Sequence, residues 1–317
     1  MFRYLHTGAN NMIRNKLKLF SVFFCVFLLT GCELVRWKID NDEGSLKDAG
    51  FAQHGLSLNE GGTINYWRGG QGEPLLLIHG FGGSAISTWK AEMLALSKDY
   101  QIIAPDLAWF GDSFSAGEAN LTTETDAIWQ LLDHLQISRT NVAGISYGGF
   151  ITFNMMNKPE RINKAVIIAS PGPYFSDQDL AELNQRFAVD AAEDFFVPKN
   201  QQELRRLFDG IFVEPKMMPD FIADQIYQTY FATWHKQKIA MIQSLPADRD
   251  ILLQQSTKDL PPTMLIWGEQ DRIFPLANGI ELSKKMSAPI VVLPNTAHGV
   301  TNEKPEAVVN LIKTFIN

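Results

Sequence analysis

Short apolar runs alternate with longer segments of helical spacing from about residue 56 to the end of the chain. The run PLLLIHG at 74–80 ends in glycine, which is typical of a buried strand. We predict strands at 74–80, 100–107, 140–146, 162–170, 263–271 and 289–295. We predict helices at 88–99, 122–135, 147–160, 276–286 and 305–317, with Thr122 or Thr123 as the N-cap of the second. Apolar strands that alternate with helices predict an α/β fold, in which helices cover both faces of a mostly parallel sheet.

The alternation stops between about 172 and 255, where the pattern predicts several helices rich in aromatic residues and methionine. We interpret 172–255 as a helical cap inserted into a core formed by 56–171 and 256–317. Most aromatic residues of a cap pack it onto the body. An apolar inner surface would also suit an apolar substrate.

The N-terminal residues 1–31 differ from the rest, because they carry four basic residues and no acidic ones. The apolar run Leu19–Leu29 is too short to span a bilayer and predicts a secretory signal, which starts at Met1 or at Met12. Its end, LLTGC, resembles the bacterial lipobox, in which the cysteine is lipidated and becomes the new N-terminus. That resemblance implies a lipoprotein signal peptide at 1–31 and a lipid anchor on Cys32. The residues that follow are polar and show no clear periodicity, so we interpret 32–55 as a tether. The alternative is an ordinary signal peptide with a chance cysteine.

The resemblance to the lipobox also implies where the protein is located in the cell. Glu33 follows the cysteine where aspartate would favour the inner membrane, so we expect attachment to the outer membrane of a bacterial envelope. An ordinary signal would give a secreted or periplasmic protein. Cys25 lies in the apolar run, so the mature chain would have no disulfide and no metal site built on cysteine. The net charge of −7 argues against nucleic acid as a partner.

The first candidate catalytic motif is GISYG at 144–148, where Ser146 follows a predicted strand and precedes a predicted helix. A serine nucleophile needs a histidine base and an acid that orients the histidine. His298 is the candidate base, because it follows the last predicted strand, and ligands bind at the carboxyl edge of parallel sheets. Asp271 is the candidate acid; Glu269 is close by but fits the pattern G-x-x-D-x-x-x-P less well. The order Ser146, Asp271, His298 is that of α/β-hydrolases.

An oxyanion intermediate needs N–H donors near the nucleophile. We expect these to be the backbone N–H groups of Tyr147 and Phe81, the second in the glycine-rich loop HGFGGS at 79–84. His79 is expected to shape this loop by hydrogen bonding.

As a set, HGFGG, PDLAWFGDS, GISYGG, WGEQD and NTAHG resemble the α/β-hydrolase family from about residue 56 to 317. The resemblance implies an eight-stranded sheet with the cap after the sixth strand, and no metal or organic cofactor. It makes Asp106 a brace of the oxyanion loop. Trp109 replaces a small residue of the family, so it protrudes towards the pocket or packs in the core.

The cap resembles that of the monoacylglycerol-lipase-like branch, which includes bacterial lipases of the Moraxella type. This implies a carboxylester substrate whose acyl chain lies under the cap. Dehalogenases and epoxide hydrolases are set aside, because they carry aspartate where this chain has Ser146. A carbon–carbon bond hydrolase of the meta-cleavage type, a cofactor-free perhydrolase and a non-catalytic binding lipoprotein stay open as alternatives. The sequence does not indicate an oligomeric state.

Overall fold

The computed structural model describes residues 33–214, 217–255 and 259–317. Its centre is one sheet in which eight strands follow the order β1-β2-β4-β3-β6-β7-β8-β9, and the two-residue β5 pairs with β2. All pairs from β4 to β9 are parallel, whereas β1 and β2 are antiparallel to their neighbours. The strands are β1 Ala52–Ser57, β2 Gly62–Gly69, β3 Glu73–Ile78, β4 Tyr100–Pro105, β5 Phe114–Ser115, β6 Thr140–Ile145, β7 Ile162–Ile168, β8 Thr263–Gly268 and β9 Ile290–Leu293.

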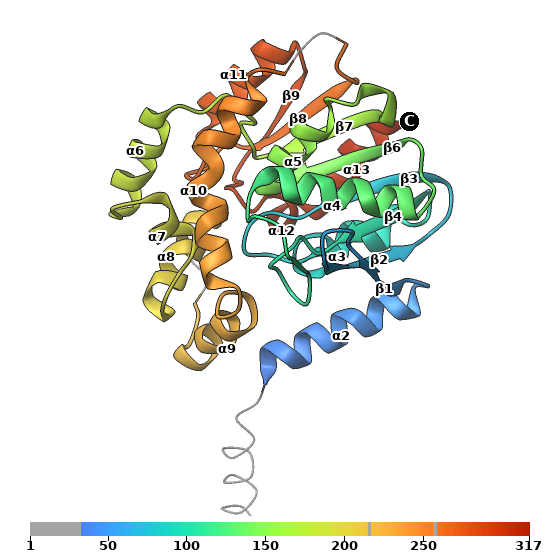
Figure 1. The fold of residues 1–317 in the computed structure, drawn as a ribbon. Helices are drawn as coiled ribbons and strands as arrows, with labels where there is room; N and C mark the ends of the chain where they lie inside the picture. The colour runs from blue at the N-terminus through green and yellow to red at the C-terminus, as the bar shows by residue number, and fades with distance from the viewer. Residues whose placement is uncertain (1–32, 215–216, 256–258) are drawn as a thin grey trace, which may run out of the picture.

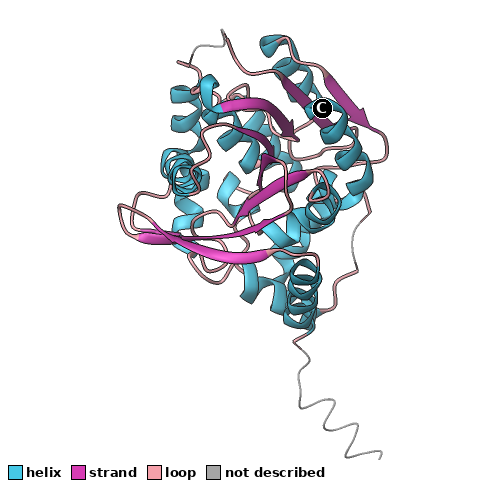
Figure 2. Cartoon of the chain, turned by 90° about the vertical axis from the view of Figure 1, so that its right-hand side faces the viewer, coloured by secondary structure: helices cyan, strands magenta, loops and turns pink. Residues whose placement is uncertain are grey.

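Helices cover both faces of this sheet, as Figures 1 and 2 show. Side chains alternate along β3, so that Leu76 and Ile78 join one apolar cluster and Leu75 and Leu77 join the other. The first cluster is completed by α4 Leu121–His134, α5 Tyr147–Met155 and α11 Leu276–Met286. The second is completed by α3 Ala85–Leu96, α12 Val300–Glu303 and α13 Pro305–Ile316. The predicted α/β fold with a mostly parallel sheet is therefore confirmed.

The cap lies between β7 and β8, after the sixth strand of the eight-strand path. Its helices are α6 Asp177–Phe187, α7 Ala192–Phe196, α8 Gln201–Ile211, α9 Asp220–Tyr230 and α10 His235–Leu252. They gather on one side of the sheet in Figure 1. Phe187, Phe195 and Phe196 are buried among them; the rings of Phe187 and Phe195 stack, and Phe196 meets Phe195 edge to face.

The predicted tether over 32–55 is wrong for most of its length. Leu34–Asp48 forms the helix α2, which packs against α3 and α9, and β1 begins at Ala52. The buried carboxylate of Asp42 accepts hydrogen bonds from Lys38 and from Lys90 of α3. Few apolar residues of α2 are buried, so its sequence shows no clear periodicity. Its position depends on polar partners far away in the chain.

The structure also tests the predicted N-cap of α4. The N-cap of α4 is Asn120, whose side chain accepts a hydrogen bond from the N–H of Thr123, so the prediction of Thr122 or Thr123 is wrong.

The predicted signal peptide and Cys32 lie outside the described residues. No helix within the described ranges is long and apolar enough to cross a membrane.

Glu92 on α3 is 1% exposed, and its Oε1 has no hydrogen-bond partner among the described residues. Burial raises the pKa of Glu92 from 4.5 to about 8. The folded state therefore keeps a proton that the unfolded state loses above about pH 4.5. The contribution of Glu92 to stability is full below pH 4.5 and falls as the pH rises to about 8.

Glu92→Gln is expected to remove this pH dependence, because the amide resembles the protonated acid. At pH 8 its free energy of unfolding should exceed that of the wild type by about 2–4 kcal/mol, and the two should agree near pH 4.5. Urea unfolding over this pH range measures the difference. The exposed Glu118→Gln serves as control, and equal slopes with pH for wild type and Glu92→Gln would refute the assignment.

Candidate active site

Ser146 lies on a sharp turn between the last residue of β6 and the first of α5. Its backbone has φ 54° and ψ −118°, a conformation that costs free energy in a residue other than glycine. The turn requires glycine on both sides. A Cβ on Gly148 would lie 2.4 Å from the carbonyl oxygen of Ile78, and one on Gly144 would lie 2.2 Å from that of Gly148. The motif therefore holds the hydroxyl of Ser146 above the carboxyl edge of the sheet.

The structure brings the three predicted catalytic residues together from three strand ends. The Ser146 Oγ lies 2.8 Å from His298 Nε2, and His298 Nδ1 lies 2.9 Å from Asp271 Oδ2. The side chain of Asp271 is fully buried and that of His298 is 8% exposed. With Nδ1–H donating to the carboxylate, the lone pair of Nε2 faces the serine hydroxyl, which is the arrangement a general base needs.

The carboxylate of Asp271 is held by the backbone that follows it. Its Oδ1 accepts hydrogen bonds from the N–H groups of Ile273 at 2.8 Å and Phe274 at 3.0 Å. Glu269 is exposed and lies 3.4 Å from the N–H of Asn295, so it does not contact His298. The choice of Asp271 over Glu269 agrees with this geometry.

The loop after β3 lies directly against the nucleophile. A Cβ on Gly80 would lie 3.1 Å from the Cβ of Ser146. Among the described residues, no hydrogen-bond acceptor is found for the backbone N–H groups of Phe81 and Tyr147. Two free donors beside the serine suit an oxyanion, and their role stays a prediction.

His79 fixes this loop and does not reach the serine. Its Nδ1 donates to the carbonyl oxygen of Gly80 at 2.8 Å, and its Nε2 accepts from the N–H of Leu107 at 2.9 Å. Burial lowers the pKa of His79 to about 4, so the ring is neutral. The predicted structural role of His79 agrees with these contacts.

Asp106 braces the start of α3, because its Oδ1 accepts a hydrogen bond of 2.7 Å from the N–H of Ala85. Burial raises the pKa of Asp106 to about 7. Trp109 is 1% exposed and packs in the apolar cluster below the cap, with φ 65°. The structure therefore favours packing over protrusion for Trp109.

Sequence reasoning missed a contact between the histidine loop and the cap. The carboxylate of Glu303 accepts from the N–H of Ala297 at 2.7 Å and from the N–H of Val213 at 2.9 Å. The N–H of Gly299 donates to the carbonyl oxygen of Ile211 at 2.8 Å. Residues on both sides of His298 are thus tied to the end of α8. No local pattern signals this contact, because its partners are about 90 residues apart.

Glu303→Ala is expected to lower kcat about 10- to 100-fold with little change in KM, because His298 loses the support of its loop. Glu303→Gln should lose less, since its amide oxygen can still accept one N–H. Steady-state kinetics on the two variants measure the effect. The exposed Glu306→Ala is the matched control, and an unchanged kcat in Glu303→Ala would contradict the positioning role.

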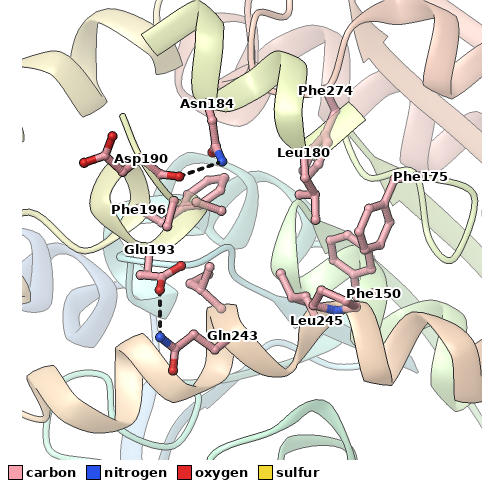
Figure 3. Close-up of a pocket in the computed structure, with 14 residues that line it drawn as sticks. Phe150, Phe175, Leu180, Asn184, Asp190, Glu193, Phe196, Gln243, Leu245 and Phe274 are labelled. Carbon is pink, nitrogen blue, oxygen red and sulfur yellow. Dashed lines mark hydrogen bonds between the residues drawn. The ribbon is translucent and has the colours of Figure 1, made fainter. Parts of the chain in front are cut away.

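A cavity of about 290 Å³ lies between the cap and α5, and Phe150, Phe175 and Phe274 are among the residues that line it (Figure 3). The ring of Phe274 packs 5.7 Å from the His298 ring and 5.9 Å from that of Phe150, which also lines the cavity. On the other side, Phe196 packs 6.2 Å from Phe81 of the glycine-rich loop. Among the described residues, none of the predicted catalytic or oxyanion residues lines the cavity itself. The ring of Phe274 lies between it and His298, and the ring of Phe196 lies between it and the glycine-rich loop.

The polar side chains of the cavity lie on the cap. Gln243 of α10 donates a 2.7 Å hydrogen bond to Glu193 of α7, and Asn184 of α6 lies 3.4 Å from the carbonyl oxygen of Asp190. The described lining includes two carboxylates and no lysine or arginine. Within the described ranges, no group of three or more histidine, cysteine or acidic residues could hold a metal ion.

A doubly covered parallel sheet with a serine, a histidine and an aspartate joined at its carboxyl edge defines a hydrolase of the α/β class. The family model for the alpha/beta hydrolase fold matches residues 73–304. The chain belongs to this family.

Proteins similar to this chain differ in the activity that their names give. The chain is 27% identical to the dihydrolipoyllysine-residue acetyltransferase component of the acetoin cleaving system of Pseudomonas putida, over 81% of this chain and 67% of that protein. It is 26% identical to the 2-hydroxymuconate semialdehyde hydrolase of a Pseudomonas strain, over 78% of this chain and 88% of that protein. Among solved structures, a bacterial membrane phospholipase A has a TM-score of 0.71 and 22% identity, over 97% of this chain and 98% of that chain. This last likeness shows the fold.

Proposed function

We propose that the protein is a serine carboxylester hydrolase that acts on esters with an apolar acyl chain, such as monoacylglycerols. The observation that carries the proposal is the complete hydrogen-bonded chain from Ser146 through His298 to Asp271, next to an apolar cavity. An acyl chain that enters this cavity past Phe274 or Phe196 would bring its ester carbonyl towards the serine. The phospholipase with the same fold acts on an ester, which agrees with this chemistry.

The mechanism follows from the distances. Ser146 Oγ attacks the ester carbonyl while His298 Nε2 accepts its proton, and Asp271 stabilises the imidazolium. The N–H groups of Phe81 and Tyr147 donate to the oxyanion. His298 returns the proton to the leaving alcohol, and an acyl group remains on Ser146. Water, activated by His298, then attacks the acyl group and releases the acid and the free serine.

A carbon–carbon bond hydrolase is the second candidate, because a hydrolase of 2-hydroxymuconate semialdehyde is among the relatives. The substrate of that relative carries a carboxylate, which favours a cation in its site. The described lining of this cavity offers no lysine or arginine to such a carboxylate; its only charged side chains are the carboxylates of Asp190 and Glu193. The charge of the cavity therefore favours a neutral ester. A purely binding role is disfavoured, because a strained Ser146 backbone is retained where it serves chemistry.

Turnover of monoacylglycerols and p-nitrophenyl esters over a range of acyl lengths, beside a 2-hydroxy-6-oxo-dienoate, tests the proposal. We expect ester turnover with an optimum at one chain length, set by the cavity, and much slower cleavage of the dienoate. Faster cleavage of the dienoate than of every ester would overturn the assignment in favour of the carbon–carbon hydrolase.

We further propose that the chain is attached to the bacterial envelope through a lipid on Cys32. The support is the sequence LLTGC after a short apolar run with basic residues before it. Globomycin, which blocks lipoprotein signal cleavage, should cause the unprocessed chain to accumulate. Cleavage that is insensitive to it, or at another residue, would contradict the anchor.

A further inference from the structure

Large apolar side chains are exposed where the cap meets the N-terminal helix. On α2, Leu34 is 42% exposed and Trp37 is 67% exposed. Just before α9 and in its first turn, Met217 is 97% exposed and Phe221 is 55% exposed. Single exposed apolar residues are ordinary, but a group of them around one contact indicates an interaction surface. We refer to these four residues as the α2–α9 apolar face.

Leu34, Trp37 and Phe221 each lie within one helical turn of a contact between the two helices. The N–H of Val35 donates a 3.0 Å hydrogen bond to Oε1 of Gln225. Phe221 precedes Gln225 by one helical turn and lies on the same side of α9, and Leu34 and Trp37 are likewise three residues apart on α2. Figure 1 shows α9 and the start of α2 at one end of the molecule, with α11 and the end of α10 at the other.

We propose that the α2–α9 apolar face lies against the lipid bilayer and orients the domain on the membrane. The proposal rests on the anchor at Cys32. An extended chain spans at most about 3.6 Å per residue, so Leu34 lies within about 7 Å of Cys32. A lipidated Cys32 therefore fixes the start of α2 at the membrane surface, whichever way the domain turns. Tryptophan at this depth is favoured, because its amphipathic ring suits the boundary between lipid and water.

The charges near this face indicate what kind of lipid contact it makes. Arg36 pairs with Asp40 and Lys38 pairs with Asp42, so the start of α2 has little net charge. Burial of apolar surface, and not attraction to anionic lipids, should then hold the face. Its depth in the bilayer should be nearly independent of salt and of phosphatidylglycerol.

The orientation has a consequence for the reaction. The residue after α9, Phe231, packs against the glycine-rich loop, so that a Cβ on Gly82 would lie 2.8 Å from its ring. The eleven residues of α9 span about 16 Å. One end of α9 therefore lies at the proposed bilayer surface and the other beside the candidate oxyanion donor Phe81. An ester in the lipid leaflet that this face contacts would therefore reach Ser146 by a short path.

Environment-sensitive fluorophores on single cysteines test the contact in the full-length, processed protein. The probe is placed at Trp37→Cys and Phe221→Cys, and as controls at Ile251→Cys and Ile280→Cys, which replace apolar residues 54% and 40% exposed at the other end. Labelling of the parent protein gives the background from Cys32. The protein is reconstituted in phosphatidylcholine vesicles with and without phosphatidylglycerol.

We expect blue-shifted emission and quenching by a shallow spin-labelled lipid at positions 37 and 221, and neither at 251 and 280. Water-like emission at 37 and 221 in protein that floats with the vesicles would overturn the contact and leave the anchor intact. Protein that does not float would overturn the anchor, and the contact with it. A blue shift without vesicles that grows with protein concentration would assign the face to a second copy of the chain and overturn the proposal.

Activity gives a second readout. Trp37→Ser/Phe221→Ser should hydrolyse a soluble short-chain ester at the wild-type rate and an ester embedded in vesicles about tenfold more slowly. Ile251→Ser/Ile280→Ser is the matched control and should change neither rate. Equal loss on both substrates, or no loss on either, would contradict the proposal. If no ester is hydrolysed at all, the proposed function fails, and the fluorescence still decides the membrane contact.

Discussion

Ser146→Ala is expected to lower kcat for ester hydrolysis by about 10⁶-fold, because the residues of such a triad act as a unit and the nucleophile has no substitute. Among the described residues, Ser146 is the hydroxyl group that hydrogen-bonds to His298, with its Oγ 2.8 Å from Nε2. Steady-state turnover of the best ester in the chain-length series measures the effect. The folded state should persist, since the change removes one oxygen atom from a partly exposed side chain.

Thermal unfolding is the control for Ser146→Ala, and it should show a Tm close to that of the wild type. A fluorophosphonate should label the wild type and not the variant. Ester turnover within tenfold of the wild type in a folded Ser146→Ala would show that another group performs the reaction.

Asp271→Asn is expected to lower kcat by about 10⁴-fold at neutral pH. The amide can still accept the N–H groups of Ile273 and Phe274 through its oxygen, so the loop keeps its geometry. Its NH₂ group then faces His298 Nδ1 and forces the proton onto Nε2, where it blocks transfer from the serine. The stability of the fold should change far less than kcat.

Glu269→Gln is the matched control for Asp271→Asn, because Glu269 is the other acidic residue of the same loop and is exposed. Its kcat should stay within about twofold of the wild type, since exposed substitutions away from the reacting atoms have small effects. A larger loss in Glu269→Gln than in Asp271→Asn would exchange the roles of the two acids.

The three candidate catalytic residues could be predicted because each follows a strand of the parallel sheet, buried in the case of β6 and β8 and half-buried at the edge in the case of β9. Ser146 follows β6, Asp271 follows β8 and His298 follows β9, and parallel strands end at one edge of the sheet. Their local sequences were enough to align side chains that are up to 152 residues apart. Motif residues next to buried strands are where sequence reasoning is strongest.

The contacts of α2 and Glu303 could not be predicted in this way. Asp42 and Glu303 are single polar residues in segments without a motif, and their partners Lys90 and Val213 are 48 and 90 residues away. The free energy of such contacts depends on burial that only the folded chain creates. The antiparallel strands β1 and β2 could not be predicted either, because both contain glycine and the residues of β1 are mostly exposed, so no apolar run marks them.

The central claim is that Ser146 forms an acyl intermediate from a carboxylester, and mass spectrometry of a rapidly quenched reaction tests it most directly. With a p-nitrophenyl ester, we expect a burst of nitrophenol close to one equivalent of enzyme, and the mass of the acyl group on the peptide that contains Ser146. Ester turnover without this adduct on Ser146, under conditions where the burst occurs, would contradict the account.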